Sequence, residues 1–169
     1  MSASEDRGSV LVLGIGNVLM GDEGIGVHVV NRLQELDLPD HLTCLDGGTG
    51  GFALLGAMGE ARRIVMIDAT IDGAPSGSVR RLCPRFSRDY PRTLTAHDIG
   101  LKDLLDVLYL TDSAPDVTLF AVSIEALQEV GAPLSSELSA RVPEFVALVL
   151  EELGLDAAAE RRAVDAAVS

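Results

Sequence analysis

The chain reads SVLVLGIGNVLMGDEGIG from Ser9 to Gly26, and this stretch decides the start of the predicted fold. Its first part, Ser9–Leu13, is short, contains β-branched residues and ends at glycine, which is typical of a strand buried on both faces. Beyond the glycine-containing loop, apolar residues recur at helical spacing, at Ile25, Val29, Leu33 and Leu36. We therefore predict a strand, a loop and an amphipathic helix, with Asp22 as the helix N-cap.

The same strand and helix signals alternate along the rest of the chain. Short apolar runs predict further strands over Leu42–Leu45, Arg63–Ile67, Gly77–Leu82 and Val117–Val122. Helical patterns cover Phe52–Met58, a segment from near His97 to Leu108, and Val142–Leu150 before a stop at Gly154. This alternation requires crossover connections, so it predicts an α/β fold, a three-layer αβα sandwich around a mostly parallel sheet. We assign residues 1–154 to a single domain and residues 155–169 to a C-terminal tail that is helical or disordered.

The composition excludes several classes of function. The 169 residues include 26 acidic and 13 basic ones, so the formal net charge is −13. Binding to nucleic acid or to an anionic membrane surface depends on clustered Lys and Arg, which this sequence lacks. The polar N-terminus does not resemble a signal peptide, and no apolar run approaches the ~20 residues of a membrane span. The two cysteines lack the spacing of a zinc site or a redox pair. We expect a cytoplasmic protein.

Acidic residues stand at or beyond the carboxyl ends of three predicted strands. Glu23 follows the first strand, Asp46 ends the second and Asp68 ends the third. Because such strand ends meet at one edge of an open α/β sheet, these carboxylates can converge there. His97 begins a later helix, where the helix dipole favours the neutral imidazole that binds metals. Two carboxylates and one histidine would bind a metal and leave coordination positions open for a substrate.

The residue pattern alone leaves other interpretations open. An acid after a strand is often only a helix cap, and a histidine there is often only a helix-start residue. Gly14 and Gly16 resemble the start of a dinucleotide-binding loop, but Leu19 replaces its third glycine, and acids at the helix start would repel a pyrophosphate. The sequence contains neither an H-E-x-x-H zinc helix nor a G-x-S-x-G nucleophile elbow. Water assisted by a metal or a carboxylate is then the remaining route to hydrolysis.

Four ordered motifs resemble those of a known family. The stretch from Gly14 to Gly26 resembles the opening signature of the NiFe-hydrogenase maturation endopeptidases. Asp46-Gly47-Gly48-Thr49 is similar to that family's second glycine motif, and Ile67-Asp68-Ala69 and Thr95-Ala96-His97 are similar to its later motifs. The resemblance runs from about Val10 to Leu153 and implies a twisted, five-stranded sheet between helices.

The resemblance also implies an activity and a site. Enzymes of this family are hydrolases that remove a C-terminal peptide from the precursor of a NiFe-hydrogenase large subunit after nickel has been inserted. Their metal-binding trio maps to Glu23, Asp68 and His97, which are our catalytic and metal-binding candidates. Asp46, Gly47, Gly48 and Thr49 are the corresponding substrate-binding candidates. The resemblance implies an aspartyl-type or metal-assisted endopeptidase whose nickel arrives in the precursor, and no organic cofactor is expected.

Two alternatives belong to other classes of function. A non-catalytic, nickel-dependent docking protein with the same fold would bind the precursor without shortening it. A small nucleotide-binding domain would use Gly14 and Gly16 to bind NAD or ATP, and enlarging Gly16 would weaken that binding.

Overall fold

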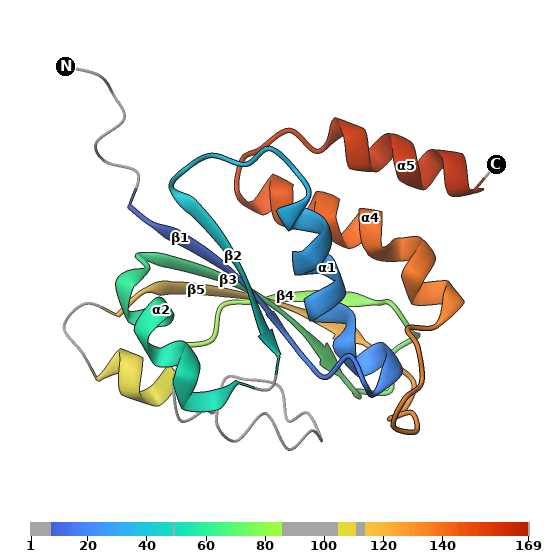
Figure 1. The fold of residues 1–169 in the computed structure, drawn as a ribbon, viewed down its shortest axis with the longest axis horizontal. Helices are drawn as coiled ribbons and strands as arrows, with labels where there is room; N and C mark the ends of the chain where they lie inside the picture. The colour runs from blue at the N-terminus through green and yellow to red at the C-terminus, as the bar shows by residue number, and fades with distance from the viewer. Residues whose placement is uncertain (1–7, 49, 86–104, 111–113, 169) are drawn as a thin grey trace.

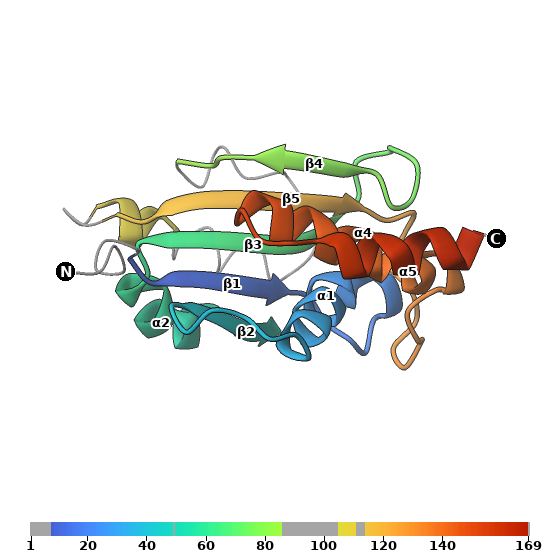
Figure 2. The ribbon, with the colours of Figure 1, turned by 90° about the horizontal axis from the view of Figure 1, so that it is seen from above.

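The computed structural model describes residues 8–48, 50–85, 105–110 and 114–168, and it contains a five-stranded sheet. The strands are β1 (Val10–Ile15), β2 (Leu42–Gly48), β3 (Arg63–Thr70), β4 (Val79–Leu82) and β5 (Asp116–Ser123). Their order across the sheet is β2-β1-β3-β5-β4, which is visible from above in Figure 2. Every neighbouring pair is parallel except β4 and β5. The predicted mostly parallel sheet is confirmed.

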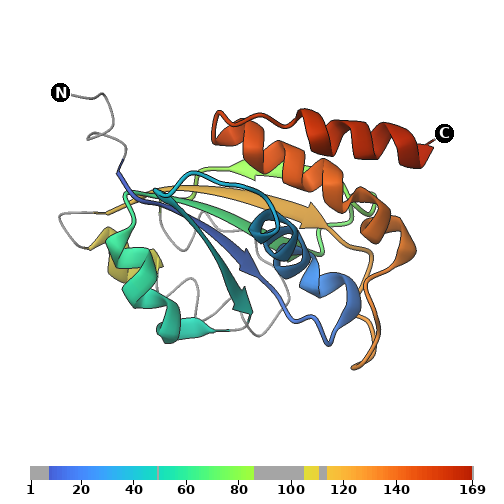
Figure 3. The same cartoon turned by 45° about the horizontal axis from the view of Figure 1, so that its top comes forward.

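Helices cover both faces of this sheet. They are η1 (Gly21–Gly24), α1 (Ile25–Gln34), η2 (Gly51–Leu54), α2 (Leu55–Glu60), α4 (Ser136–Glu152) and α5 (Ala158–Val168), and residues 105–109 are also helical. Figures 1 and 3 show α1 and α4 on one face and α2 with residues 105–109 on the other. The α/β three-layer architecture is therefore confirmed.

Alternating side chains of the central strands make two separate cores. Val12 and Val65 pack with α1 and α4, whereas Leu13 and Met66 pack with α2 and the helical residues 105–109. Successive residues of a strand point to opposite faces, so continuous apolar runs are needed where helices cover both sides. This requirement explains why β1 and β3 read as unbroken apolar runs.

The end of α4 follows the sequence prediction. Gly154 adopts a φ of +70°, and its N–H donates to the carbonyl oxygen of Glu151 at 3.0 Å. The N–H of Leu155 donates to the carbonyl oxygen of Leu150 at 2.8 Å, which completes a Schellman motif. Beyond this stop, the expected C-terminal tail contains α5, which lies along α4.

The start of α1 differs from the prediction. Asp22 is not its N-cap, because Gly24 occupies that position and no side chain caps this helix. A short 3₁₀ helix, η1, comes first, and its first residue, Gly21, turns the chain with a φ of +59°. The predicted helix from His97 to Leu108 is described only from residue 105 onward, so His97 lies outside the described residues. No helix in the described ranges is long and apolar enough to cross a membrane.

Candidate active site

The predicted acids lie at one edge of the sheet, where β1, β2 and β3 end side by side. The parallel register pairs Gly14 with Ile67 on β3 and Ile15 with Gly48 on β2. Asp68 is the next residue of β3 after Ile67, and Asp46 precedes Gly48 by two residues. The chain leaves β1 at this edge, as Figure 1 shows, and Glu23 follows in η1 before α1 begins. The strand-end rule therefore located these acids correctly.

Glu23 is buried, with an exposed fraction of 3%. Its segment is held close to the end of β1 by Gly16, whose φ is +135°. A Cβ atom on Gly16 would lie 2.0 Å from the carbonyl oxygen of Glu23, so only glycine fits there. Burial of a carboxylate is costly and persists only with compensating polar groups or a cation. The close contact with Gly16 therefore holds the backbone of Glu23 at the sheet edge.

Asp68 is also buried, with an exposed fraction of 4%, and it lies inside β3 rather than after it. Its Oδ1 accepts a hydrogen bond from the N–H of Ala69 at 2.8 Å. Ile67 and Ala69 belong to the core beneath α1 and α4, and side chains alternate along a strand. Asp68 therefore points toward the opposite face, the one that carries α2.

Gly26 brings the Glu23 segment against the end of β3. A Cβ atom on Gly26 would lie 2.2 Å from the carbonyl oxygen of Ile67 and 2.5 Å from that of Ile15. Gly14 is equally tight, because its Cβ would lie 2.3 Å from the carbonyl oxygen of Gly26. These contacts explain Gly14, Gly16 and Gly26 by close packing of a helix start on two strands, without a nucleotide.

The second glycine motif forms the carboxyl end of β2, an edge strand. Asp46 is exposed, and its Oδ1 accepts a hydrogen bond from the N–H of Gly48 at 2.9 Å. Gly48 has a φ of +47°, which turns the chain away from the sheet. Gly47 is buried against Leu13 and Ile15, with room for no side chain. Thr49 lies outside the described residues.

Within the described ranges, no group of three or more His, Cys, Asp and Glu side chains could hold a metal ion. That search does not reach His97, the predicted third ligand. Glu23 and Asp68 remain as two buried carboxylates from neighbouring segments, and carboxylate oxygens are suitable ligands for divalent cations.

Sequence reasoning missed the loop of residues 124–135, which follows β5. The side-chain Oε1 of Gln128 accepts a hydrogen bond from the N–H of Asp22 at 2.7 Å. In return, Oδ1 of Asp22 accepts a hydrogen bond from the N–H of Ser135, also at 2.7 Å. Asp22 thus joins η1 to the start of α4 instead of capping α1. No periodicity or motif in this loop signals these long-range bonds.

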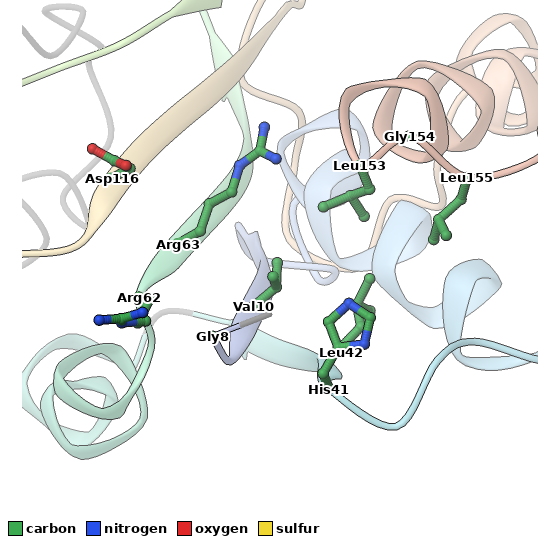
Figure 4. Close-up of a pocket in the computed structure, with 10 residues that line it drawn as sticks. All are labelled: Gly8, Val10, His41, Leu42, Arg62, Arg63, Asp116, Leu153, Gly154 and Leu155. Carbon is green, nitrogen blue, oxygen red and sulfur yellow. The ribbon is translucent and has the colours of Figure 1, made fainter. Parts of the chain in front are cut away.

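A cavity of about 580 Å³ lies at the other end of the strands, shown in Figure 4. Its lining includes Val10, Leu42, Arg63 and Asp116, the first residues of four parallel strands. Arg63 donates to Glu152, so its charge is already compensated by the fold. None of the predicted catalytic residues that the structure describes lines this cavity, and we assign the site to the carboxyl edge instead.

Comparison with known proteins agrees with this fold and shows the family of the chain. The family model of hydrogenase maturation proteases, HycI, matches residues 27–152. The chain is 34% identical to the Hydrogenase 2 maturation protease of Escherichia coli over 154 residues, which cover 88% of this chain and 94% of that protein. This chain belongs to the hydrogenase maturation protease family. The family match spans Asp46 and Asp68 but begins after Glu23.

Two further relatives support the membership. The hydrogenase expression/formation protein HupD of Bradyrhizobium diazoefficiens is 30% identical, with 90% of this chain and 82% of that protein covered. The solved structure of the hydrogenase maturating endopeptidase HybD from E. coli superposes with a TM-score of 0.79 at 34% identity, covering 86% of this chain and 91% of that one. The predicted family resemblance and the peptidase class are therefore confirmed.

Proposed function

We propose that this hydrogenase maturation protease removes the C-terminal extension of a NiFe-hydrogenase large-subunit precursor after nickel insertion. The observation that carries the proposal is the pair of buried carboxylates, Glu23 and Asp68, held at the carboxyl edge of the sheet in a chain of this family. The named relatives act in hydrogenase maturation, which supports a hydrogenase precursor as the substrate of this chain.

In this proposal, nickel belongs to the substrate. The precursor holds the ion mainly through its own cysteines, and Glu23, Asp68 and His97 complete the coordination when the two proteins dock. Each added ligand lowers the free energy of the docked complex only if nickel is present. The trio therefore makes nickel a condition for cleavage, because a nickel-free precursor lacks the shared contact.

The end of β2 provides the approach for the peptide. Gly48 and Gly50 carry no side chains and are not buried, so a peptide backbone can come close to them, whereas Gly47 packs against Leu13 and Ile15. Asp46 and Thr49 are the polar residues that we assign to substrate binding beside these glycines. The exposed carboxylate of Asp46 already holds the turn at Gly48, which fixes this end of the strand.

Hydrolysis of the peptide bond then needs an attacking water and a polarised carbonyl group. In this proposal, a carboxylate of the trio would accept a proton from the attacking water, and nickel held by the trio beside the scissile bond would polarise its carbonyl group. The water oxygen adds to the carbonyl carbon, the C–N bond breaks, and the released amine takes the proton. Glu23, Asp68 and His97 thus serve in both binding and catalysis.

Mass spectrometry of the precursor tests this function. Wild-type protein should shorten the nickel-loaded precursor by one C-terminal peptide and leave the nickel-free precursor intact. Glu23→Gln, Asp68→Asn and His97→Ala should each reduce the rate at least 100-fold, whereas Asp40→Asn, a change at an exposed carboxylate, should not.

Each of the other outcomes identifies a different function. Binding of the precursor without loss of mass would support the docking protein. Full cleavage by the His97→Ala variant would exclude a ligand role for His97. Equal cleavage of the nickel-free precursor would exclude the nickel requirement while leaving the peptidase in place.

A further inference from the structure

Exposed apolar side chains gather beside the candidate active site. Among the described residues, six large apolar side chains are exposed, and four of them come from the loop after β1 and the loop after β5. These four are Val18 (44% exposed), Leu19 (58%), Leu127 (45%) and Val130 (77%). Exposed apolar side chains that cluster are typical of protein interaction sites, whereas single ones need no explanation.

Hydrogen bonds join the two loops that carry these side chains. The N–H of Gly131 donates to the carbonyl oxygen of Leu19 at 2.6 Å, and Met20 and Ala132 form a parallel bridge. The bond from Asp22 to Gln128 links the same two segments. Figures 1 and 3 show the loops side by side at the carboxyl edge of the sheet. We call residues 17–20 and 125–131 together the rim.

The rim is shaped before any partner binds. Oδ1 of Asn17 accepts a hydrogen bond from the N–H of Leu19 at 3.0 Å, which fixes the turn that presents Val18 and Leu19. Gly21 ends this loop at a φ of +59°, and a Cβ atom there would lie 1.5 Å from Oε1 of Gln128. A surface held in this way loses little conformational entropy on binding, so more of its contact energy contributes to affinity.

We propose that the rim is the docking surface for the folded body of the large-subunit precursor, separate from the contacts that the trio makes with nickel. This inference rests on the proposed function, since the rim runs directly into η1 and Glu23. A partner that places its nickel site at Glu23 therefore lies beside the rim. The four apolar side chains then supply binding energy that does not depend on the metal.

The charges on the rim define the matching surface of the precursor. Glu125 and Glu129 are exposed on the same loop as Leu127 and Val130. The whole chain carries a net charge of −13. The partner surface should therefore present apolar side chains bordered by Lys or Arg. Such a pairing accelerates encounter and weakens as salt is added.

Steady-state kinetics on the nickel-loaded precursor tests the rim. Leu127→Asp and Val130→Asp, alone and together, place a charge where an apolar contact is expected and leave Glu23, Asp68 and His97 unchanged. We expect the double variant to raise KM about 100-fold, since each buried aliphatic side chain is worth about one factor of ten, while kcat stays within about twofold of wild type. Leu110→Asp is the matched control, because Leu110 is 85% exposed and directly follows the helical residues 105–109, which lie on the face of the sheet that carries α2.

A direct binding measurement separates this inference from the proposed function. Immobilised precursor should bind the rim double variant at least tenfold more weakly than it binds wild type. It should bind the Leu110→Asp variant as tightly as wild type, and thermal melting should show that all three proteins fold.

Equal binding and equal KM for wild type and the double variant would overturn the rim while leaving the peptidase intact. Failure of wild type to cleave would overturn the proposed function, and the binding comparison would still decide the rim. A parallel fall in kcat without a change in KM or binding would also overturn the rim, because it would indicate damage to the trio.

Discussion

Two adjacent acids at the start of the first helix have different roles. Asp22 and Glu23 are neighbours in sequence and both are buried, with exposed fractions of 8% and 3%. Asp22 uses its carboxylate to hold the N–H of Ser135 and its own N–H to hold Gln128, so it serves the fold. Glu23 is left at the edge near Asp68. The sequence analysis predicted a structural role for Asp22 but the wrong one, a helix cap, because the bonds of Asp22 reach residues more than 100 positions away.

A substitution at Gly26 tests the close packing of the start of α1 against β1 and β3. Gly26→Ala places a Cβ atom against two backbone carbonyl groups, those of Ile67 and Ile15, which cannot rotate away. We expect a loss of about 1–3 kcal/mol in the free energy of unfolding, typical of overpacking, and a fall in cleavage because Glu23 moves away from β3. Urea denaturation and the cleavage assay measure the two effects.

Gly56→Ala is the matched control for that change. Gly56 lies in α2 with no atom of another residue near its Cβ position, so alanine should add about 0.5–1 kcal/mol of stability by improving helix propensity. Cleavage should stay at the wild-type rate. Equal stability changes for the two variants would contradict the close contact at Gly26.

At the scale of whole elements, the sequence predicted those that depend on local signals. The unbroken apolar run of β3 and the glycine after α4 are signals of this kind, and both elements were found. The strand ends were less well placed, because β2 and β3 continue through Asp46 and Asp68 instead of stopping there. Hydrogen bonds to a neighbouring strand decide where a strand ends, and a single sequence does not reveal its partner.

The sequence predicted the acidic residues of the candidate site but missed the loop beside them. The strand-end rule was sufficient to bring Glu23, Asp46 and Asp68 to one edge, since it depends only on parallel strands. The loop of residues 124–135 was missed, because its role arises from bonds between Gln128, Asp22 and Ser135 that have no sequence pattern. The position of His97 stays a prediction.

Glu152, at the end of α4, couples three elements through a pH-sensitive contact. Hydrogen bonds from Arg81 of β4 lower the pKa of this carboxyl group, and the charges of Arg81 and Arg63 act in the same direction against the effect of burial. A lowered folded pKa means that its contribution to stability is complete above the ordinary value of 4.5 and is lost as pH falls through the folded value.

We expect Glu152→Gln to flatten the stability curve at acid pH. The free energy of unfolding of wild type should fall as pH drops below about 4.5. The variant should be less stable than wild type at pH 7, and its free energy of unfolding should fall less over the same range. Urea denaturation between pH 3 and 7 gives both curves. Glu60→Gln, at an exposed carboxylate, should follow wild type; parallel curves for wild type and Glu152→Gln would exclude this coupling.

Across the whole molecule, the two ends of the sheet have opposite chemistry. The amino ends of the strands carry Arg62 and Arg63 beside Asp116, and Arg63 is neutralised by Glu152 of α4. The carboxyl ends carry the buried acids Glu23 and Asp68 with the apolar rim beside them. The buried carboxylates that we propose as ligands for a cation therefore lie at the carboxyl end. The helix α4 begins beside η1, where Ser135 donates to Asp22, whereas α5 packs along α4.

Removal of α5 should consequently separate stability from activity. This helix packs on α4 and contributes Glu160, a carboxylate that is 2% exposed and accepts a hydrogen bond from Arg32 at 2.8 Å. A chain ending at Ala157 exposes apolar residues of α4, so we expect it to lose about 2–5 kcal/mol of unfolding free energy, the value of one or two buried aliphatic side chains. Below its melting temperature, it should cleave the nickel-loaded precursor at a rate within about threefold of wild type, because α5 contributes nothing to the carboxyl edge.

Urea denaturation measures the stability of the truncated chain, and the mass-spectrometric assay measures its cleavage rate. Arg32→Leu is the full-length control of lowered stability, because it leaves Glu160 buried without its guanidinium partner. A truncated chain that folds but does not cleave would show that the domain needs residues beyond 157 for its activity.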